Sequence, residues 1–240
     1  MMRAIHLLFA LACYAFGVAM LVYLICFVGN LPYVPVTIDN GPIVPLGTAL
    51  VIDVALIALF GVQHSVMARP GFKQAWTRMV PAKTERNFYV LATGLVLALF
   101  FYLWRPIGGV VWSVEGAGAT VLWAVFWMGW AITFLTTFLI NHFELFGLQQ
   151  AWSNRPIAPK FVQPLLYRMM RHPLYFGLLL GFWATPLMTW GHVLFAAGMT
   201  AYILLAIRYE ERDLTVVFGE EYRVCQTRVG MLIPGIGKQG

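Results

Sequence analysis

The sequence predicts an all-α integral membrane protein, a polytopic bundle of five to six helices with a C-terminal helical hairpin and a cytoplasmic tail. Of its 240 residues, 60% are hydrophobic and only 11% are charged, whereas globular proteins average about 25% charged residues. Long apolar runs recur along the chain, and lysine and arginine collect in alternate segments between them. No soluble domain fits between these runs, so we expect a single integral membrane domain over residues 1–240.

Six apolar runs are the expected membrane helices, because a spanning helix needs roughly 17–25 residues. They are residues 5–28, 47–67, 88–104, 119–140, 173–189 and 191–207. The first run lacks a small-residue cleavage site after a basic start, which favours a retained helix over a removable signal peptide. The last two runs are short, so five or six crossings are expected. Pro186 and Gly191 between them predict the turn of the hairpin.

The distribution of lysine and arginine predicts the orientation, because these residues gather on the cytoplasmic side of membrane helices. Five fall in residues 68–87, four in 142–172 and five in 208–240, against none in 29–46 and one in 105–118. We therefore expect the N-terminus and the three rich segments to lie in the cytoplasm. The two segments that are poor in lysine and arginine should lie on the outer side of the cell (inner) membrane.

Cysteine usage does not point to disulfide or metal chemistry. Cys13 and Cys26 lie on one predicted helix, about 20 Å apart and too far to bridge. Cys225 stands alone in the tail, and no Cys/His spacing typical of a metal site occurs. We expect no disulfide, no metal ion and no nucleic-acid partner, and the sequence does not predict an oligomeric state.

Polar side chains gather at the predicted cytoplasmic ends of the helices, although an ionisable residue in a membrane span is costly and usually faces a cavity or a partner. These residues are Gln63, His64, Ser65, Glu85, Arg86, Asn141, His142, Glu144, Gln149, Arg171, His172, Tyr175, Arg208, Glu210 and Glu211. The outer loops offer only Asp39, Arg105 and Glu115. We therefore expect a functional site that faces the cytoplasm.

The residues at the two cytoplasmic ends of the predicted hairpin indicate a site for a ligand with charges of both signs. Pro173 suits the first turn of a helix, whose free N–H groups and dipole favour an anion. Arg171 adds a cation there and His172 a switchable donor, while the returning helix brings Glu210 and Glu211, which can hold an ammonium or sulfonium group. The methionine moiety of S-adenosylmethionine fits this pairing better than a simple anion does.

Three C-terminal motifs, "RHPLYFG", "EERDL" and "GEEYRVCQTRVGMLIP", resemble the signature of the isoprenylcysteine carboxyl methyltransferase and phospholipid methyltransferase superfamily. The resemblance covers residues 171–234. It implies that S-adenosylmethionine binds in a cytoplasmic helical pocket within a cofactor-binding region over residues 165–234. The chain departs from the family pattern at one position. Many members have a second tyrosine three residues after the first, whereas this chain has Cys225 three residues after Tyr222.

Carried over by position, the same resemblance implies the residues of the cofactor pocket. Arg171, His172 and Tyr175 would line it, and Glu210 or Glu211 would hold the charged methionine end.

Three motifs of the front half narrow the resemblance. "GVQHSVMAR", "ERNFYVL" and "NHFELFGLQQ" resemble the NnrU-like branch, and most closely the membrane methanethiol S-methyltransferases. This implies methyl transfer from S-adenosylmethionine to a small thiol, converting methanethiol into dimethyl sulfide. The helices of residues 1–141 would then form the substrate wall, in contact with membrane lipids.

The expected reaction needs help to ionise the thiol, because a free cysteine-type thiol has a pKa of about 8.5. His142 and His64 are the candidate bases, with His142 slightly ahead because Asn141 and Glu144 offer orienting partners. Arg86 could lower the thiol pKa by its charge. Taken singly, each histidine is more typical of an interfacial residue hydrogen-bonded to its neighbours.

Two alternatives stay open at this point. A methyltransferase of the same superfamily could act on a prenylcysteine carboxylate or a phospholipid amine. In another class, two histidines on different helices could ligate a haem in a membrane electron-transfer subunit. That second alternative leaves the Arg-His-Pro and Glu-Glu motifs unexplained.

Overall fold

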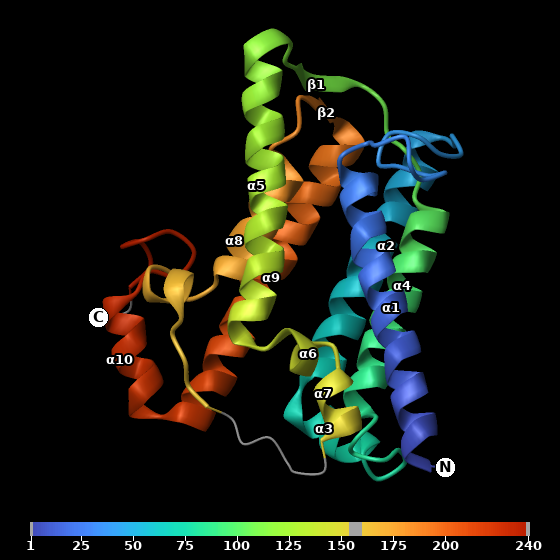
Figure 1. Cartoon of the computed structure of the whole chain (residues 1–240). Coiled ribbons are helices and arrows are strands. Elements are labelled where there is room, and N and C mark those ends of the chain that lie inside the picture. The colour runs from blue at the N-terminus through green and yellow to red at the C-terminus, as the bar shows by residue number, and fades with distance from the viewer. Residues whose placement is uncertain (1, 154–159, 239–240) are drawn as a thin grey trace. The chain divides into compact units, whose positions relative to one another are not determined.

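The computed structural model is mainly helical, and it describes residues 2–153 and 160–238 (Figure 1). Residues 154–159, inside the segment predicted to be cytoplasmic, lie outside the described residues, as do the extreme ends. The helices are α1 (Met2–Val28), α2 (Leu46–Ala68), α3 (Pro70–Trp76), α4 (Glu85–Leu103), α5 (Gly116–Ile140), α6 (His142–Leu145), α7 (Leu148–Trp152), α8 (Pro173–Trp183), α9 (Trp190–Phe218) and α10 (Glu220–Arg228), with a 3-10 turn at Leu165–Arg168. Two short strands, β1 (Val110–Ser113) and β2 (Leu187–Thr189), pair into a two-stranded sheet.

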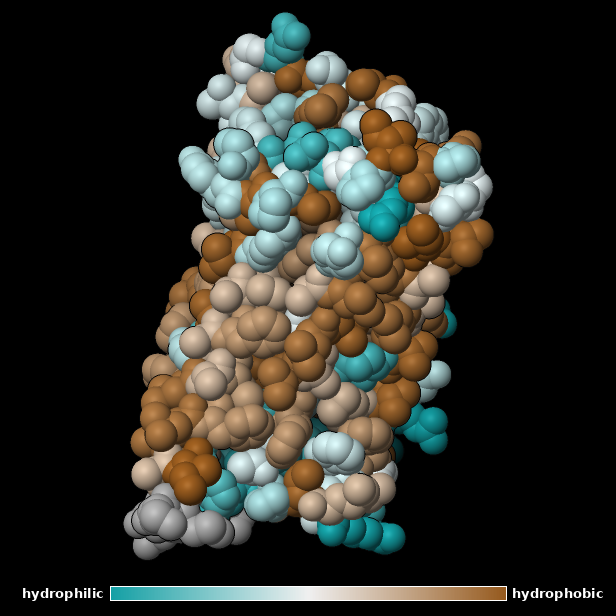
Figure 2. Space-filling model, turned by 90° about the vertical axis from the view of Figure 1, so that its right-hand side faces the viewer, coloured by the Kyte–Doolittle hydropathy of each residue, from teal (hydrophilic) through white to brown (hydrophobic). Residues whose placement is uncertain are grey.

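Five helices, α1, α2, α4, α5 and α9, are long and apolar enough to cross a membrane. Many of their large hydrophobic side chains are exposed, among them Leu8, Val51 and Val121. Figure 2 shows hydrophobic side chains over the middle of one face, with hydrophilic ones gathered toward its two ends. Because lipid, not water, covers such surfaces, the chain is a polytopic, all-α membrane protein, as the sequence predicted.

The first compact unit comprises residues 2–111, the segment from residue 142 through α7, and residues 189–195. Helices α1 and α4 approach closely within it, because Gly17 lies against Val90 and Gly94 against Phe16. A Cβ added to Gly94 would lie 2.6 Å from the Phe16 ring. Small residues thus allow the backbones to approach, as in other membrane helix pairs.

The second compact unit comprises residues 112–141, the described part of 158–188, and residues 196–238. Its helices α5 and α8 pack backbone to backbone. A Cβ on Gly177 would lie 2.6 Å from the carbonyl oxygen of Gly129, and one on Gly181 would lie 2.9 Å from the Trp130 ring. Gly177 and Gly181 therefore form the small-xxx-small contact that brings membrane helices together.

The sixth predicted crossing, residues 173–189, is helical for only part of its length. Helix α8 has eleven residues, which rise about 16 Å, and extended chain then continues toward β2. That chain reaches the N-terminal end of α5, because Val114 N–H donates to the Pro186 carbonyl (2.9 Å) and Trp112 Nε1 donates to the Thr185 carbonyl (3.0 Å). Non-helical backbone at membrane depth is tolerated where protein covers it, and Ala184, Thr185 and Met188 are buried.

The expected helix was therefore wrong for residues 184–189, and the expected helix over 191–207 was too short. Pro186 lacks an N–H and restricts the residue before it, so α8 cannot continue through this point. Helix α9 instead runs on through "RYEERDL" to Phe218, because arginine, glutamate and leucine are good helix formers even where the apolar pattern stops.

Candidate active site

The start of α8 is held by the C-terminal tail. Met170 and Gly230 form a parallel bridge, Arg171 N–H donates to the Gly230 carbonyl (2.8 Å), and His172 N–H donates to the Met231 carbonyl (3.1 Å). A Cβ at Gly230 would lie 2.1 Å from the Ile233 carbonyl oxygen, so only glycine fits this turn. The tail thus fixes the backbone of Arg171 and His172, the two residues that precede Pro173 and the first turn of α8.

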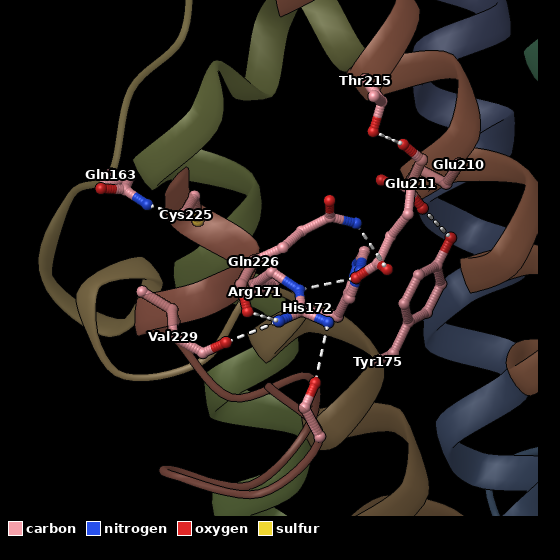
Figure 3. A network of polar contacts seen from close by, with 11 residues as sticks. Gln163, Arg171, His172, Tyr175, Glu210, Glu211, Thr215, Cys225, Gln226 and Val229 are labelled. Atoms are coloured by element: carbon pink, nitrogen blue, oxygen red, sulfur yellow. Dashed lines mark hydrogen bonds and ion pairs between the residues drawn. The ribbon is translucent and has the colours of Figure 1, made fainter. Parts of the chain in front are cut away.

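Arg171 is buried and almost fully engaged within the second unit (Figure 3). Its Nε donates to Glu211 Oε1 at 2.7 Å, and its terminal nitrogens donate to the carbonyls of Gln226 (3.1 Å), Val229 (2.6 Å) and Gly237 (3.1 Å). A guanidinium has five N–H groups, and four of those of Arg171 are engaged within the described residues. Arg171 primarily ties α9, α10 and the tail to the start of α8.

Glu211 is the shared acceptor of this cluster. Besides Arg171, its Oε1 lies 3.0 Å from His172 Nε2, and its Oε2 accepts from Gln226 Nε2 at 3.2 Å. Arg171, His172, Glu211 and Gln226 are all buried. A buried carboxylate is tolerated only with such charge-assisted partners, so this cluster is a closed, compensated network.

Glu210 faces a different partner. Tyr175 OH donates to Glu210 Oε2 at 2.7 Å (Figure 3), and no cation pairs with Glu210 within the described parts of the chain. The two neighbouring glutamates therefore differ in whether a cation compensates their charge. Glu211 is neutralised inside the protein, whereas the negative charge of Glu210 is left uncompensated.

Tyr222 adds a buried hydroxyl without a partner. Its side chain is buried, and its OH makes no hydrogen bond to any residue that the structure describes. Burial, with the negative charge of Glu211 next in effect, raises the pKa of Tyr222, so the group stays protonated and able to donate. An orphaned buried donor of this kind calls for an explanation, and a ligand is one.

His142 lies in the first unit, at the start of α6, and is buried. Its Nε2 lies 2.9 Å from the hydroxyl of Tyr14 on α1, and the rings of Phe143 and Phe146 pack around it. Burial lowers the pKa of the His142 imidazole, so the ring is neutral at pH 7. Tyr14 therefore orients this histidine.

His64 and Arg86 meet at Tyr89 in the same unit. His64 Nε2 lies 2.7 Å from Tyr89 OH, and its Nδ1 lies 3.3 Å from Thr93 Oγ1. The Arg86 guanidinium carbon lies 4.7 Å from the centre of the Tyr89 ring, and its Nε donates to the Leu145 carbonyl at 2.7 Å. Arg86 thus joins α4 to the last residue of α6, with its charge beside a histidine–tyrosine pair.

Asn87, next to Arg86, is fully buried and lies against Gly147. Gly147 has a φ of +82°, and a Cβ there would lie 2.6 Å from Asn87 Nδ2. Neither amide atom of Asn87 has a hydrogen-bond partner within the described residues. Such a group is costly unless a water or ligand satisfies it.

The structure places the predicted residues in two groups. The candidate catalytic residues, His64, Arg86 and His142, lie in the first unit, and the candidate cofactor residues lie in the second. The sequence did not point to further polar residues in these two groups: Tyr14, Asn87, Thr93 and Gln226. Asn87 follows Arg86 directly, so its place in the same motif could have revealed it, whereas nothing in the sequence near Tyr14 points to His142.

Several known proteins are similar to this chain. The model of the phospholipid methyltransferase family matches residues 112–221. A methanethiol S-methyltransferase of Mycobacterium tuberculosis is 46% identical over 239 residues, which cover 98% of both chains. Another, from Pseudomonas deceptionensis, is 52% identical over 87% of this chain and 81% of its own length. Nurim of Pan troglodytes is 31% identical over 68% of this chain and 66% of its own length. No solved structure matches the chain.

Proposed function

This chain belongs to the methanethiol S-methyltransferase family, and we propose that it transfers a methyl group from S-adenosylmethionine to methanethiol, forming dimethyl sulfide. The observation that carries the proposal is the near-complete coverage by relatives of that name, at 46% identity over 98% of the chain. The Arg171, His172 and Glu211 network at the start of α8 supports it from the structure. Neither the described structure nor the comparisons support the haem alternative.

The donor set of the second unit fits S-adenosylmethionine. The cofactor carries an ammonium, a carboxylate and a sulfonium, so its site needs an uncompensated anion and free donors. Glu210 is such an anion, and the orphaned Tyr222 hydroxyl is such a donor. We propose that Glu210, held by Tyr175, takes the positive end, and that Tyr222 and His172 donate to the carboxylate. When bound, the cofactor supplies an electrophilic methyl group.

The buried cluster has a different role in this proposal. Glu211 is already neutralised by Arg171, so it contributes little attraction for a second cation. Instead the cluster fixes the C-terminal end of α9, and with it the neighbouring Glu210. Arg171 and Glu211 are therefore proposed as positioning residues of the cofactor site.

The thiol must lose its proton before its sulfur attacks. We propose that His142 accepts this proton, because burial keeps its ring neutral and Tyr14 fixes its orientation. His64 is the second candidate base, with both ring nitrogens near hydroxyl groups. Arg86 would favour the thiolate by its charge. His142 is buried among aromatic rings, and a water-poor site favours a reaction in which charge is dispersed.

The site is proposed to face the cytoplasm at the inner membrane. The arginine- and lysine-rich segments flank the ends of the helices that carry His64, Arg86, His142 and Glu210, and such segments stay on the cytoplasmic side.

The direct test is to incubate the purified protein with methanethiol and S-adenosylmethionine labelled at the methyl group. We expect labelled dimethyl sulfide, formed at least a hundredfold more slowly by His142→Gln, since a general base contributes about 10²–10⁴ in rate. His6→Gln, a histidine of α1 far along the chain from these motifs, is the matched control. If no labelled dimethyl sulfide forms although the protein binds the cofactor, the proposed acceptor is wrong.

A further inference from the structure

The second unit has a groove of about 460 Å³ along α9 and α10, and neither Tyr175 nor Glu210 lines it. Three arginines line it, Arg208 and Arg212 from α9 and Arg223 from α10, together with Glu211, Val216 and Gln226. Arg208 and Arg212 are four residues apart, so their side chains share one face of α9.

The groove carries a net positive charge. The carboxylate of Glu211 is neutralised by Arg171 at 2.7 Å. Arg208 and Arg212 are exposed, and neither has a hydrogen bond or an ion pair within the described parts of the chain. Among the residues described, the Arg223 side chain has only a distant ion pair with Glu220, 3.9 Å away, and both side chains are exposed. Three guanidinium groups therefore remain available to an anion, which they can bind bidentately.

The length of α9 places these arginines at the edge of the bilayer. Its 29 residues rise about 43 Å, whereas the hydrocarbon core is about 30 Å thick. Counted from Trp190, Arg208 stands about 27 Å along the helix. Leu204 and Leu205, one turn earlier, are exposed apolar residues. Within the groove, Val216 is 80% exposed. Apolar surface therefore lies next to the arginine side chains at the level expected for lipid headgroups.

We propose that this groove binds the headgroup of an anionic phospholipid, with the phosphate on Arg208, Arg212 and Arg223. The acyl chains would follow the exposed leucines of α9. A zwitterionic headgroup fits less well, because its ammonium would meet three arginines. The site would anchor the α9–α10 corner to the membrane surface, since each basic residue near an anionic leaflet strengthens attraction.

The test is a titration of the full-length protein in neutral detergent with a fluorescent phosphatidylglycerol, and with phosphatidylcholine of the same chains. We expect phosphatidylglycerol to bind at least tenfold more tightly. Arg212→Gln should weaken its binding about fivefold, as expected for one basic residue. Arg212→Lys keeps the charge and should retain most of the affinity, which guards against a loss caused by misfolding.

Arg228→Gln is the matched control, because it removes the same charge from an exposed position of α10 that does not line the groove. It should change the affinity less than twofold. Equal affinity for the two lipids, or equal losses in Arg212→Gln and Arg228→Gln, would overturn the proposal. Displacement of the lipid by millimolar inorganic phosphate would show a site for small anions instead. Displacement by S-adenosylmethionine would assign the groove to the cofactor.

Discussion

At the scale of single residues, two adjacent glutamates have different environments. Glu211 is buried with Arg171, His172 and Gln226, while Glu210 accepts a hydrogen bond from Tyr175 and has no cationic partner within the described chain. From the sequence, either carboxylate was an equal candidate for the cofactor. The difference arises because consecutive helical residues point about 100° apart, so one faces the tail and the other does not.

Tyr175→Phe should therefore weaken S-adenosylmethionine binding without loss of stability. Without this hydroxyl the Glu210 carboxylate must be ordered when the cofactor binds, which costs about 0.5–1.5 kcal/mol, so the dissociation constant should rise about two- to tenfold. Calorimetric titration measures this, and thermal unfolding should be unchanged. Tyr33→Phe, at an exposed position, is the control. Unchanged affinity in Tyr175→Phe would place the cofactor elsewhere.

Glu211→Gln should instead destabilise the protein. It leaves the buried Arg171 without its counter-charge, and breaking a buried ion pair costs about 3–5 kcal/mol. The midpoint of thermal unfolding should fall clearly below that of Arg228→Gln, an exposed charge change. A Glu211→Gln protein as stable as the parent would mean that the pair is not structural.

The burial of His142 should make the folding stability of the protein depend on pH. Its ordinary pKa is 6.5, and burial lowers that pKa in the folded protein. Below pH 6.5 the unfolded chain binds a proton that the folded chain resists, so stability falls as the pH drops and levels off below the folded pKa. The parent should therefore lose more stability between pH 7.5 and 5 than His142→Gln does. Equal losses would show that His142 is not buried in its neutral form.

At the scale of elements, the helices of the membrane bundle were predictable and their ends were not. Apolar runs identified α1, α2, α4 and α5 to within a few residues, because lipid imposes both length and composition. The same rule failed at α8 and α9. Burial of residues 184–185 allows extended chain after α8, and that burial depends on contacts with residues distant in the sequence. Helix α9 continues beyond the apolar run because its charged residues are also good helix formers, which an apolar pattern does not register.

The packing of α5 on α8 gives a prediction at this scale. Gly177→Ala would place a Cβ 2.6 Å from the Gly129 carbonyl oxygen and should force the helices apart. Such overpacking costs about 1–3 kcal/mol, measured as a lower midpoint of thermal unfolding in detergent. Gly47→Ala, in α2 with no atom within 4 Å of the new Cβ, should be neutral or slightly stabilising. Equal effects of the two substitutions would contradict this packing.

At the scale of the whole molecule, the five apolar helices and the alternation of segments rich and poor in lysine and arginine are typical of a multi-pass membrane protein. The candidate residues of both groups came from motifs, since the superfamily signature and the front-half motifs are local in sequence. The pairs Tyr14–His142 and Asn87–Gly147 were not predictable, because they join segments more than fifty residues apart through the fold alone.

The central claim is that the acceptor is methanethiol and the donor S-adenosylmethionine. The most direct measurement gives the purified protein labelled S-adenosylmethionine with methanethiol, a prenylcysteine analogue and phosphatidylethanolamine in one reaction, and follows the label. We expect the label in dimethyl sulfide, and neither other acceptor should gain it at a comparable rate. Label in the lipid or the prenylcysteine analogue, with none in dimethyl sulfide, would contradict it.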